Sequence, residues 1–179
     1  KFKVLLILLL TKGKLLLLGL TKASTVFSML LSFGVYWTAW GWKFALGLVL
    51  SIYVHEMGHV AMLRRYGIKA SAPMFIPGVG ALVLLGQHPA TPAEDARTGL
   101  AGPMWGFGAA VAAYAVSQIM GWPSWAAIAK VGAWINLFNL LPIWQLDGGR
   151  AFNAFSRTQR WAAVACLAVR FIGAQGLPV

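Results

Sequence analysis

Long apolar runs separated by short polar or basic stretches dominate the chain. A helix needs about 20 mostly apolar residues to cross the hydrocarbon core of a bilayer, so runs of this length predict membrane-spanning helices. We predict five spans, the last of them somewhat polar, at residues 25–42, 44–63, 100–121, 125–141 and 160–177. The pattern therefore indicates an all-α polytopic membrane protein.

Residues 1–23 are apolar but do not form a further span. Lys12 and Lys14 divide them into two short apolar pieces, a pattern typical of a basic and apolar segment that lies at the membrane interface. We expect residues 24–179 to form a single domain. Because the chain begins without a methionine and ends abruptly, we also expect it to be a fragment of a longer protein.

Between the second and third predicted spans, the apolar stretch SAPMFIPGVGALVLLG is interrupted by prolines and glycines. β-prone residues bounded by such turn formers predict a short β-hairpin at residues 73–85. Irregular backbone at membrane depth must be shielded by protein or face water, and we expect this hairpin to be membrane-associated. The polar stretch TPAEDARTG then opens the next helix, with Glu94 and Asp95 as capping residues.

Composition strengthens the membrane prediction. Hydrophobic residues make up 59% of the chain and the mean hydropathy is +0.72, whereas soluble domains are about 45–50% apolar. A formal net charge of +11 would suggest nucleic-acid binding in a soluble protein. Here the basic residues lie at the ends of apolar runs, where anionic headgroups attract them. We therefore expect the lipid bilayer, and no nucleic acid, as a partner.

The basic residues also predict an orientation. With the N-terminus in the cytoplasm, the cytoplasmic flanks of the predicted spans hold most of them, as the positive-inside rule requires. These flanking residues are Lys12, Lys14, Lys22, Arg64, Arg65, Lys69, Arg97, Arg150, Arg157 and Arg160. The same orientation places the opening of the polar site described next on the cytoplasmic side.

The second predicted span carries the sequence VHEMGHV, in which His55, Glu56 and His59 lie within five residues. On a helix the two histidines are about 40° apart, so both imidazoles can reach one metal ion, with the glutamate beside them as a general base. Burying a charge at mid-bilayer costs about 2.5–3.5 kcal/mol, which zinc binding, worth about 10–16 kcal/mol in structural sites, can offset. The alternative is that these side chains bond to neighbouring helices.

A catalytic zinc ion usually has a third protein ligand and an open position for water. Downstream candidates are His88, Glu94, Asp95 and Asp147. Asp147 is one possibility, because Pro142 cannot continue the preceding helix normally and the chain can fold back after it. Gly148 and Gly149 permit a sharp turn that could point the aspartate back into the bundle. The alternative for this Asp-Gly-Gly sequence is an ordinary turn, and His88 is interpreted as a loop residue.

The two motifs together resemble the site-2 protease family of intramembrane zinc metalloproteases. That family pairs H-E-x-x-H with a distant motif similar to N-x-x-P-x-x-x-L-D-G, and here the two stand at residues 55–59 and 139–148. The resemblance covers most of residues 10–157. Two positions depart from the family pattern: related sequences often have a second proline where Trp144 stands and an asparagine where this chain has Gly106.

The resemblance implies a polytopic fold that holds one Zn²⁺ ion through His55, His59 and Asp147. It implies that Glu56 is the catalytic base and that the substrate is a transmembrane protein or peptide, cleaved within or near the bilayer. Residues 24–179 are accordingly interpreted as a transmembrane metalloprotease domain.

Substrate contacts are expected near the predicted hairpin and the second motif. An exposed hairpin edge could hold a substrate extended by strand addition, with Gly78 and Gly80 among the contacts. Asn139 either donates to the oxyanion or the substrate or joins two helices, as asparagine does in membranes. Asn136 is interpreted as structural.

Three further features are given structural roles. Glycines on the third predicted span allow close helix packing, Arg150 anchors at the headgroups, and the single Cys166 is a small buried hydrophobe. The glycines are Gly102, Gly106 and Gly108.

Two other functions would also place histidine and aspartate inside a membrane. A zinc transporter or channel needs such residues but does not need Glu56, so the substitution Glu56→Gln distinguishes it from a protease. A catalytically inactive homologue could serve as a membrane scaffold, although the intact H-E-x-x-H sequence and Asp147 argue against this function.

Overall fold

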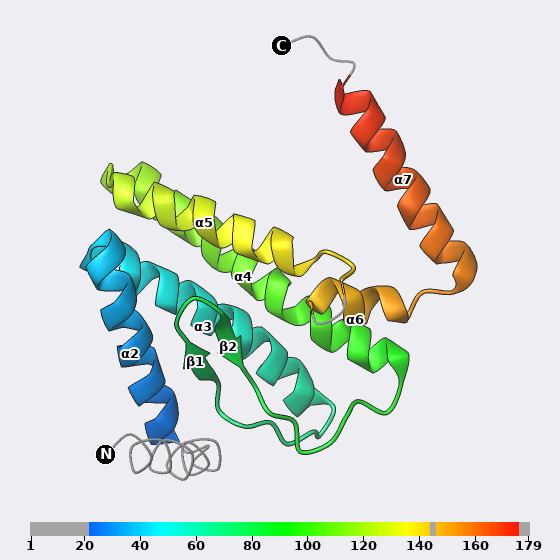
Figure 1. The fold of residues 1–179 in the computed structure, drawn as a ribbon, viewed down its shortest axis with the longest axis horizontal. Coiled ribbons are helices and arrows are strands. Elements are labelled where there is room, and N and C mark those ends of the chain that lie inside the picture. Colours follow the sequence, from blue (N-terminus) through cyan, green and yellow to red (C-terminus); the bar gives the residue numbers. More distant parts are fainter. Residues whose placement is uncertain (1–21, 144–145, 176–179) are drawn as a thin grey trace, which may run out of the picture.

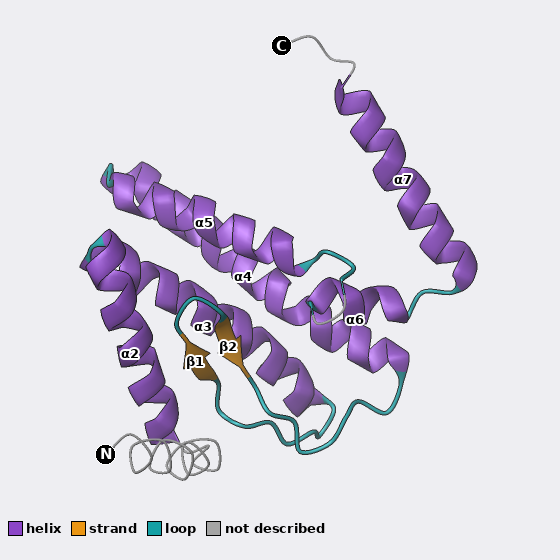
Figure 2. Cartoon of the chain, viewed as in Figure 1, coloured by secondary structure: helices purple, strands orange, loops and turns teal. Residues whose placement is uncertain are grey.

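The computed structural model describes residues 22–143 and 146–175, which form helices and one small sheet (Figures 1 and 2). The helices of this part of the chain are α2 (Lys22–Trp40), α3 (Trp42–Arg65), α4 (Pro92–Met120), α5 (Pro123–Asn139), α6 (Asp147–Asn153) and α7 (Arg157–Gln175). The strands are β1 (Met74–Ile76) and β2 (Gly80–Leu82). The predicted interfacial segment falls almost wholly outside the described residues, as does Trp144.

Helix α4 is the centre of the bundle. It packs against α3, α5 and α6, while α2 packs against α3 on the far side (Figure 1). Most of its buried residues are small: they are Thr98, Gly99, Ala101, Gly102, Pro103, Gly106, Ala110, Ala113 and Ser117. Small residues let helix backbones approach closely, so α4 can hold three neighbours at once.

The helix ends follow local sequence rules. Gly67 ends α3 with φ +70°, and the amides of Gly67 and Ile68 donate to the carbonyls of Arg64 and Leu63, a Schellman motif. Helix α4 begins eight residues before the predicted span, because Pro92 occupies its first position and Thr91 caps it.

The capping prediction is confirmed for Glu94. The side chain of Thr91 accepts from the backbone N–H of Glu94 at 3.2 Å, and the Glu94 carboxylate accepts from the N–H of Ala90 at 2.9 Å. Such reciprocal bonds satisfy donors at a helix start that have no partner within the helix.

The connection between α3 and α4 contains an antiparallel hairpin. Met74 pairs with Leu82 and Ile76 with Gly80, and positive φ angles of +79° at Gly78 and +125° at Gly80 explain why glycine occupies these positions. The hairpin docks on α2: the N–H of Phe75 donates to the Ser28 hydroxyl at 3.0 Å. The N–H of Gly78 donates likewise to the Tyr36 hydroxyl at 3.0 Å. Membrane association of the hairpin stays a prediction.

Two of the described helices, α3 and α4, are long and apolar enough to cross a membrane, with mean hydropathies of 1.4 and 1.2 over their best windows. Helices α2, α5 and α7 occupy the other three predicted ranges, and their spanning stays a prediction. Helix α7 runs away from the bundle (Figure 1). Cys166 on this helix is exposed, so its predicted burial is wrong; a helix that leaves the bundle has little against which to bury it.

Candidate metal centre

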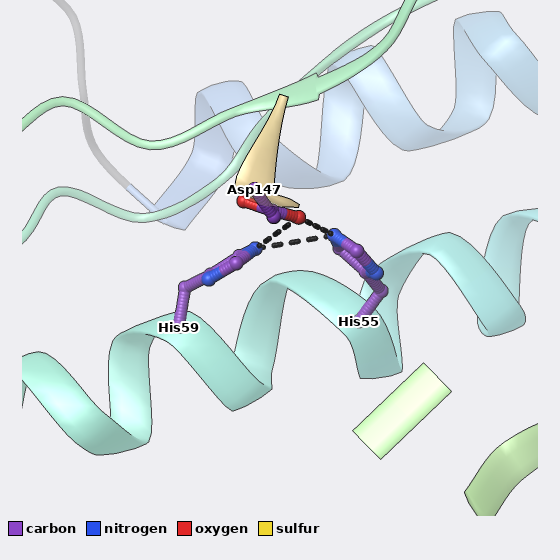
Figure 3. Close-up of side chains that lie close together, drawn as sticks. All are labelled: His55, His59 and Asp147. Carbon is purple, nitrogen blue, oxygen red and sulfur yellow. Dashed lines mark hydrogen bonds and ion pairs between the residues drawn. The ribbon is translucent and has the colours of Figure 1, made fainter. Parts of the chain in front are cut away.

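Three side chains from two distant parts of the chain converge on one point (Figure 3). His55 and His59 lie one turn apart on α3, with their Nε2 atoms 3.1 Å from each other. The Oδ2 atom of Asp147, at the start of α6, lies 3.2 Å from Nε2 of His55 and 3.3 Å from Nε2 of His59. Both histidines are buried, and the carboxylate is half-buried.

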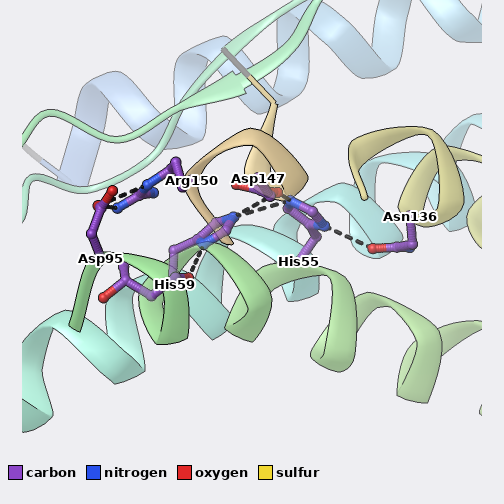
Figure 4. Close-up of polar contacts among 7 residues, drawn as sticks. His55, His59, Asp95, Asn136, Asp147 and Arg150 are labelled. Atoms are coloured by element: carbon purple, nitrogen blue, oxygen red, sulfur yellow. Dashed lines mark hydrogen bonds and ion pairs between the residues drawn. The ribbon is translucent and has the colours of Figure 1, made fainter. Parts of the chain in front are cut away.

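The outer ring nitrogens of both histidines are held by hydrogen bonds (Figure 4). Nδ1 of His59 lies 2.7 Å from the backbone carbonyl oxygen of Thr98. A carbonyl can only accept, so this Nδ1 carries the proton and donates. Nδ1 of His55 lies 2.7 Å from Oδ1 of Asn136 and donates in the same way. In its neutral form, each imidazole therefore turns an unprotonated Nε2 towards Asp147.

This arrangement fits a metal ion better than it fits a proton. Three acceptor atoms face one another, and a single proton can link only two of them, whereas a cation at the centre interacts with all three. Zinc–nitrogen bonds of about 2.0–2.1 Å in a tetrahedral site place ligand atoms about 3.4 Å apart, close to the observed 3.1–3.3 Å. Two imidazoles and one carboxylate are a donor set that zinc accepts while keeping a position open.

Asp147 reaches the histidines because α6 packs tightly against the end of α5. A Cβ atom added at Gly148 would overlap the backbone carbonyl groups of Leu140 and Leu141. The expectation of a sharp turn at Gly148 and Gly149 is wrong: both lie in the first turn of α6, with Asp147 as its first residue. Gly148 is needed for close approach, and the helix then points the carboxylate inwards.

An ion pair fastens α6 to α4. The guanidinium group of Arg150 donates to Oδ1 of Asp95 from Nε at 3.0 Å and from Nη2 at 2.6 Å (Figure 4). Arg150 lies one turn beyond Asp147 on the same short helix, so the pair helps to fix the position of the metal-site carboxylate. The sequence did not reveal this partner for either residue.

Glycines on one face of α4 form the floor of the site. A Cβ atom at Gly102 would overlap the imidazole of His59, and one at Gly106 would overlap the amide of Asn136. A Cβ at Gly99 would lie 2.8 Å from the backbone oxygen of Asp147. The predicted close packing is confirmed for Gly102 and Gly106 but is wrong for Gly108, where an added Cβ atom would meet nothing within 4 Å.

A cavity of about 1060 Å³ opens beside these residues. Its walls come from α2, α3, β2 and α5, and His55, His59 and Asp147 all line it. The other predicted site residues line it too: these are Glu56, Asn139, Gly78 and Gly80. His88 lies elsewhere, with Asp95 along a smaller open pocket of about 370 Å³.

Comparisons with known proteins point to one family. Residues 43–123 match the model of peptidase family M50. The chain is 30% identical over 112 residues to "Zinc metalloprotease MJ0392" of Methanocaldococcus jannaschii, a match that covers 60% of this chain and 32% of that protein. It is 32% identical over 130 residues to "Putative zinc metalloprotease Rip3" of Mycobacterium tuberculosis, covering 68% and 32%. The chain thus spans about a third of the length of these relatives.

The family match and the geometry are complementary. The matched segment contains α3 with its two histidines and reaches past the end of α4, but it stops before Asp147. The approach of Asp147 to the histidines comes from the structure. Residues 43–123 match peptidase family M50, and the two sequence motifs of this chain resemble the same family, the site-2 proteases.

Proposed function

We propose that this chain is the catalytic part of an intramembrane zinc metalloprotease that hydrolyses peptide bonds of transmembrane substrates. One observation carries the proposal: three metal-binding atoms from α3 and α6 face one point, on the wall of a cavity that Glu56 also lines. In this proposal His55, His59 and Asp147 hold one zinc ion. The names of the two relatives, both called zinc metalloproteases, support zinc as the metal.

Glu56 is proposed as the general base. A bound zinc ion supplies a polarising charge that makes water more acidic and a substrate carbonyl more reactive. Glu56 is buried, at 8% exposure, and follows His55 directly on α3. Its carboxylate accepts a proton from the attacking water and passes it to the departing amine, a role that typically contributes about 10²–10⁴-fold to the rate.

The cavity is proposed to receive the substrate in an extended conformation. A helical substrate hides its scissile carbonyl in its own hydrogen bonds, so it must unwind. The cavity is lined by all three residues of β2 and none of β1, which is the arrangement needed if the free edge of β2 pairs with an added strand. Gly78 and Gly80 at the turn and Asn139 on α5 would then contact the substrate.

The proposed setting is a multi-pass membrane protein. Membrane crossing by five helices, a cytoplasmic N-terminus with an interfacial segment at residues 1–23, and a site that opens to the cytoplasm are parts of the proposal. Many large apolar side chains on the outer surface support it, because lipid can cover them: examples are Phe27, Leu30, Val111 and Ile119.

The test is cleavage of labelled transmembrane peptides by the purified protein reconstituted in vesicles. We expect native protein with zinc to cleave. Glu56→Gln should retain one zinc ion per chain but lose at least about 100-fold in rate, the contribution of a general base. Chelated native protein should be inactive and should recover when zinc is returned.

Other outcomes identify the alternatives. Equal cleavage by native protein and Glu56→Gln would overturn the assigned base. Zinc flux into vesicles that survives Glu56→Gln, with no cleavage of any peptide, would indicate a transporter. Zinc absent from the native protein after equilibration would overturn the metal site.

A further inference from the structure

Asn136 is a deeply buried polar side chain beside the metal centre. It lies on α5, is 1% exposed, and makes two hydrogen bonds. Its Oδ1 atom lies 2.7 Å from Nδ1 of His55, and its Nδ2 atom donates to the backbone carbonyl of Gly132 at 2.7 Å. Both ends of the amide are therefore occupied.

The second hydrogen bond fixes the first. If the amide were flipped, its oxygen would face the carbonyl oxygen of Gly132 and its NH₂ group would face His55. The first contact would set two acceptors against each other, so only the observed orientation satisfies both partners. Oδ1 of Asn136 must then accept a proton from Nδ1 of His55. This hydrogen bond leaves Nε2 of His55 free to bind a cation.

The two histidines differ in the kind of group that orients them. The partner of His59 is the backbone carbonyl of Thr98, which no substitution of that residue removes. The partner of His55 is the side chain of Asn136, which comes from another helix and can be removed. His55 is thus the histidine whose ring orientation depends on a single replaceable side chain.

Gly106 of α4 provides the space that the amide occupies. A Cβ atom at residue 106 would fall on the Oδ1, Nδ2 and Cγ atoms of Asn136. Any larger residue there would push the amide away from His55. The amide of Asn136 therefore occupies the space that a side chain at residue 106 would take.

We propose that Asn136 is a positioning residue that sets the tautomer and ring orientation of His55 for metal binding. Gly106 has no side chain and so leaves the space that the Asn136 amide needs. The proposal rests on the metal site of the proposed function. It assigns a role to a residue outside both sequence motifs, through a hydrogen bond between α5 and α3.

The experiment measures zinc affinity by competition with a chelator, using the whole purified chain in detergent. Replacing a residue that hydrogen-bonds a metal ligand typically weakens metal binding about 10–100-fold, so we expect that loss for Asn136→Ala. Asn136→Leu, which restores volume but has no acceptor, should bind as weakly. Leu137→Ala, at the next and exposed position of α5, should bind as native protein does.

A second pair of variants tests whether Asn136 needs the space left by Gly106. Gly106→Ala should weaken zinc binding about 10-fold or more in the native background, because the new methyl group displaces Asn136. In the Asn136→Ala background the same change should have no further effect, because the displaced group is gone. Thermal unfolding of the zinc-free variants shows whether each one folds. The absorption of bound Co²⁺ reports the ligand geometry at the metal.

The outcomes separate this proposal from the proposed function. If native protein binds zinc and Asn136→Ala binds it equally well with an unchanged Co²⁺ spectrum, the positioning role is overturned while the metal site stands. Native affinity in Asn136→Leu would show that Asn136 only fills space. If Gly106→Ala and Asn136→Ala weaken zinc binding independently, so that their effects multiply, the role of Gly106 is overturned. If native protein binds no zinc, the proposed function itself fails.

Discussion

Gly102 stands where a helix would gain stability from almost any other residue. Glycine inside a helix costs about 1 kcal/mol relative to alanine, and Gly102 is buried near the middle of α4. The reason is on the opposite helix, because the imidazole of His59 fills the space that a side chain at residue 102 would take. Helix stability is given up here to admit a metal-binding side chain.

Gly102→Ala tests this explanation. We expect the variant to fold, with α4 favoured by up to about 1 kcal/mol in helix propensity, but to bind zinc at least about 10-fold more weakly because His59 must move. Gly108→Ala on the same helix, where a methyl group meets nothing within 4 Å, should keep native affinity. Chelator competition and thermal unfolding measure the two effects, and equal affinities in the two variants would contradict the explanation.

At this scale the sequence predicted the reactive groups but not the groups that orient them. His55, Glu56 and His59 are recognisable because ionisable residues at helical spacing are costly in an apolar run. From the sequence alone, a structural role is expected for Asn136 and no role is indicated for Thr98. Their hydrogen bonds join residues 81 and 39 positions apart, and no local pattern predicts such contacts.

The helices were predictable as elements because length and hydropathy identify a long apolar helix without any knowledge of its neighbours. Helix α6 was not predicted: it has only seven residues, two of them glycine, so propensity does not favour a helix. It is held from outside, by the Arg150–Asp95 ion pair and by contact with the end of α5. Its tertiary contacts override its local sequence.

Proline substitutions near β2 test whether substrate pairs with the hairpin. Ala81 of β2 and Val83, just after the strand, are half-buried and line the cavity, and a proline at either residue removes a backbone N–H from this segment. If the edge of β2 pairs with substrate, Ala81→Pro and Val83→Pro should slow cleavage of membrane peptides by about 10-fold or more, the cost of one or two lost hydrogen bonds, without releasing zinc.

The control for the hairpin is Gln87→Pro. Gln87 is exposed and lies beyond the strands, so this variant should cleave at the native rate. Native rates in both strand variants would rule out pairing of substrate with β2.

In the whole molecule, the cavity separates two units that are held together in different ways. On one side, α2 and the hairpin are joined by hydrogen bonds from strand amides to Ser28 and Tyr36. On the other, α5 and α6 pack on the glycine face of α4. Helix α3 runs between the two units (Figure 1). The sequence did not reveal this division, because it depends on which helix faces pack together.

This division predicts that tying the two units together should block the substrate and spare the metal. Val79 at the hairpin tip is 75% exposed and Trp134 on α5 is 65% exposed, and both line the cavity.

In a Cys166→Ser background, cysteines at these two residues can be joined by a cleavable thiol cross-linker. A linker between these two residues crosses the cavity and leaves less room for a substrate segment. The cross-linked protein should keep its zinc, lose cleavage of membrane peptides, and regain it when the linker is cut. Each single-cysteine variant treated with the same reagent should stay active, and full activity in the cross-linked protein would show that substrate enters by another route.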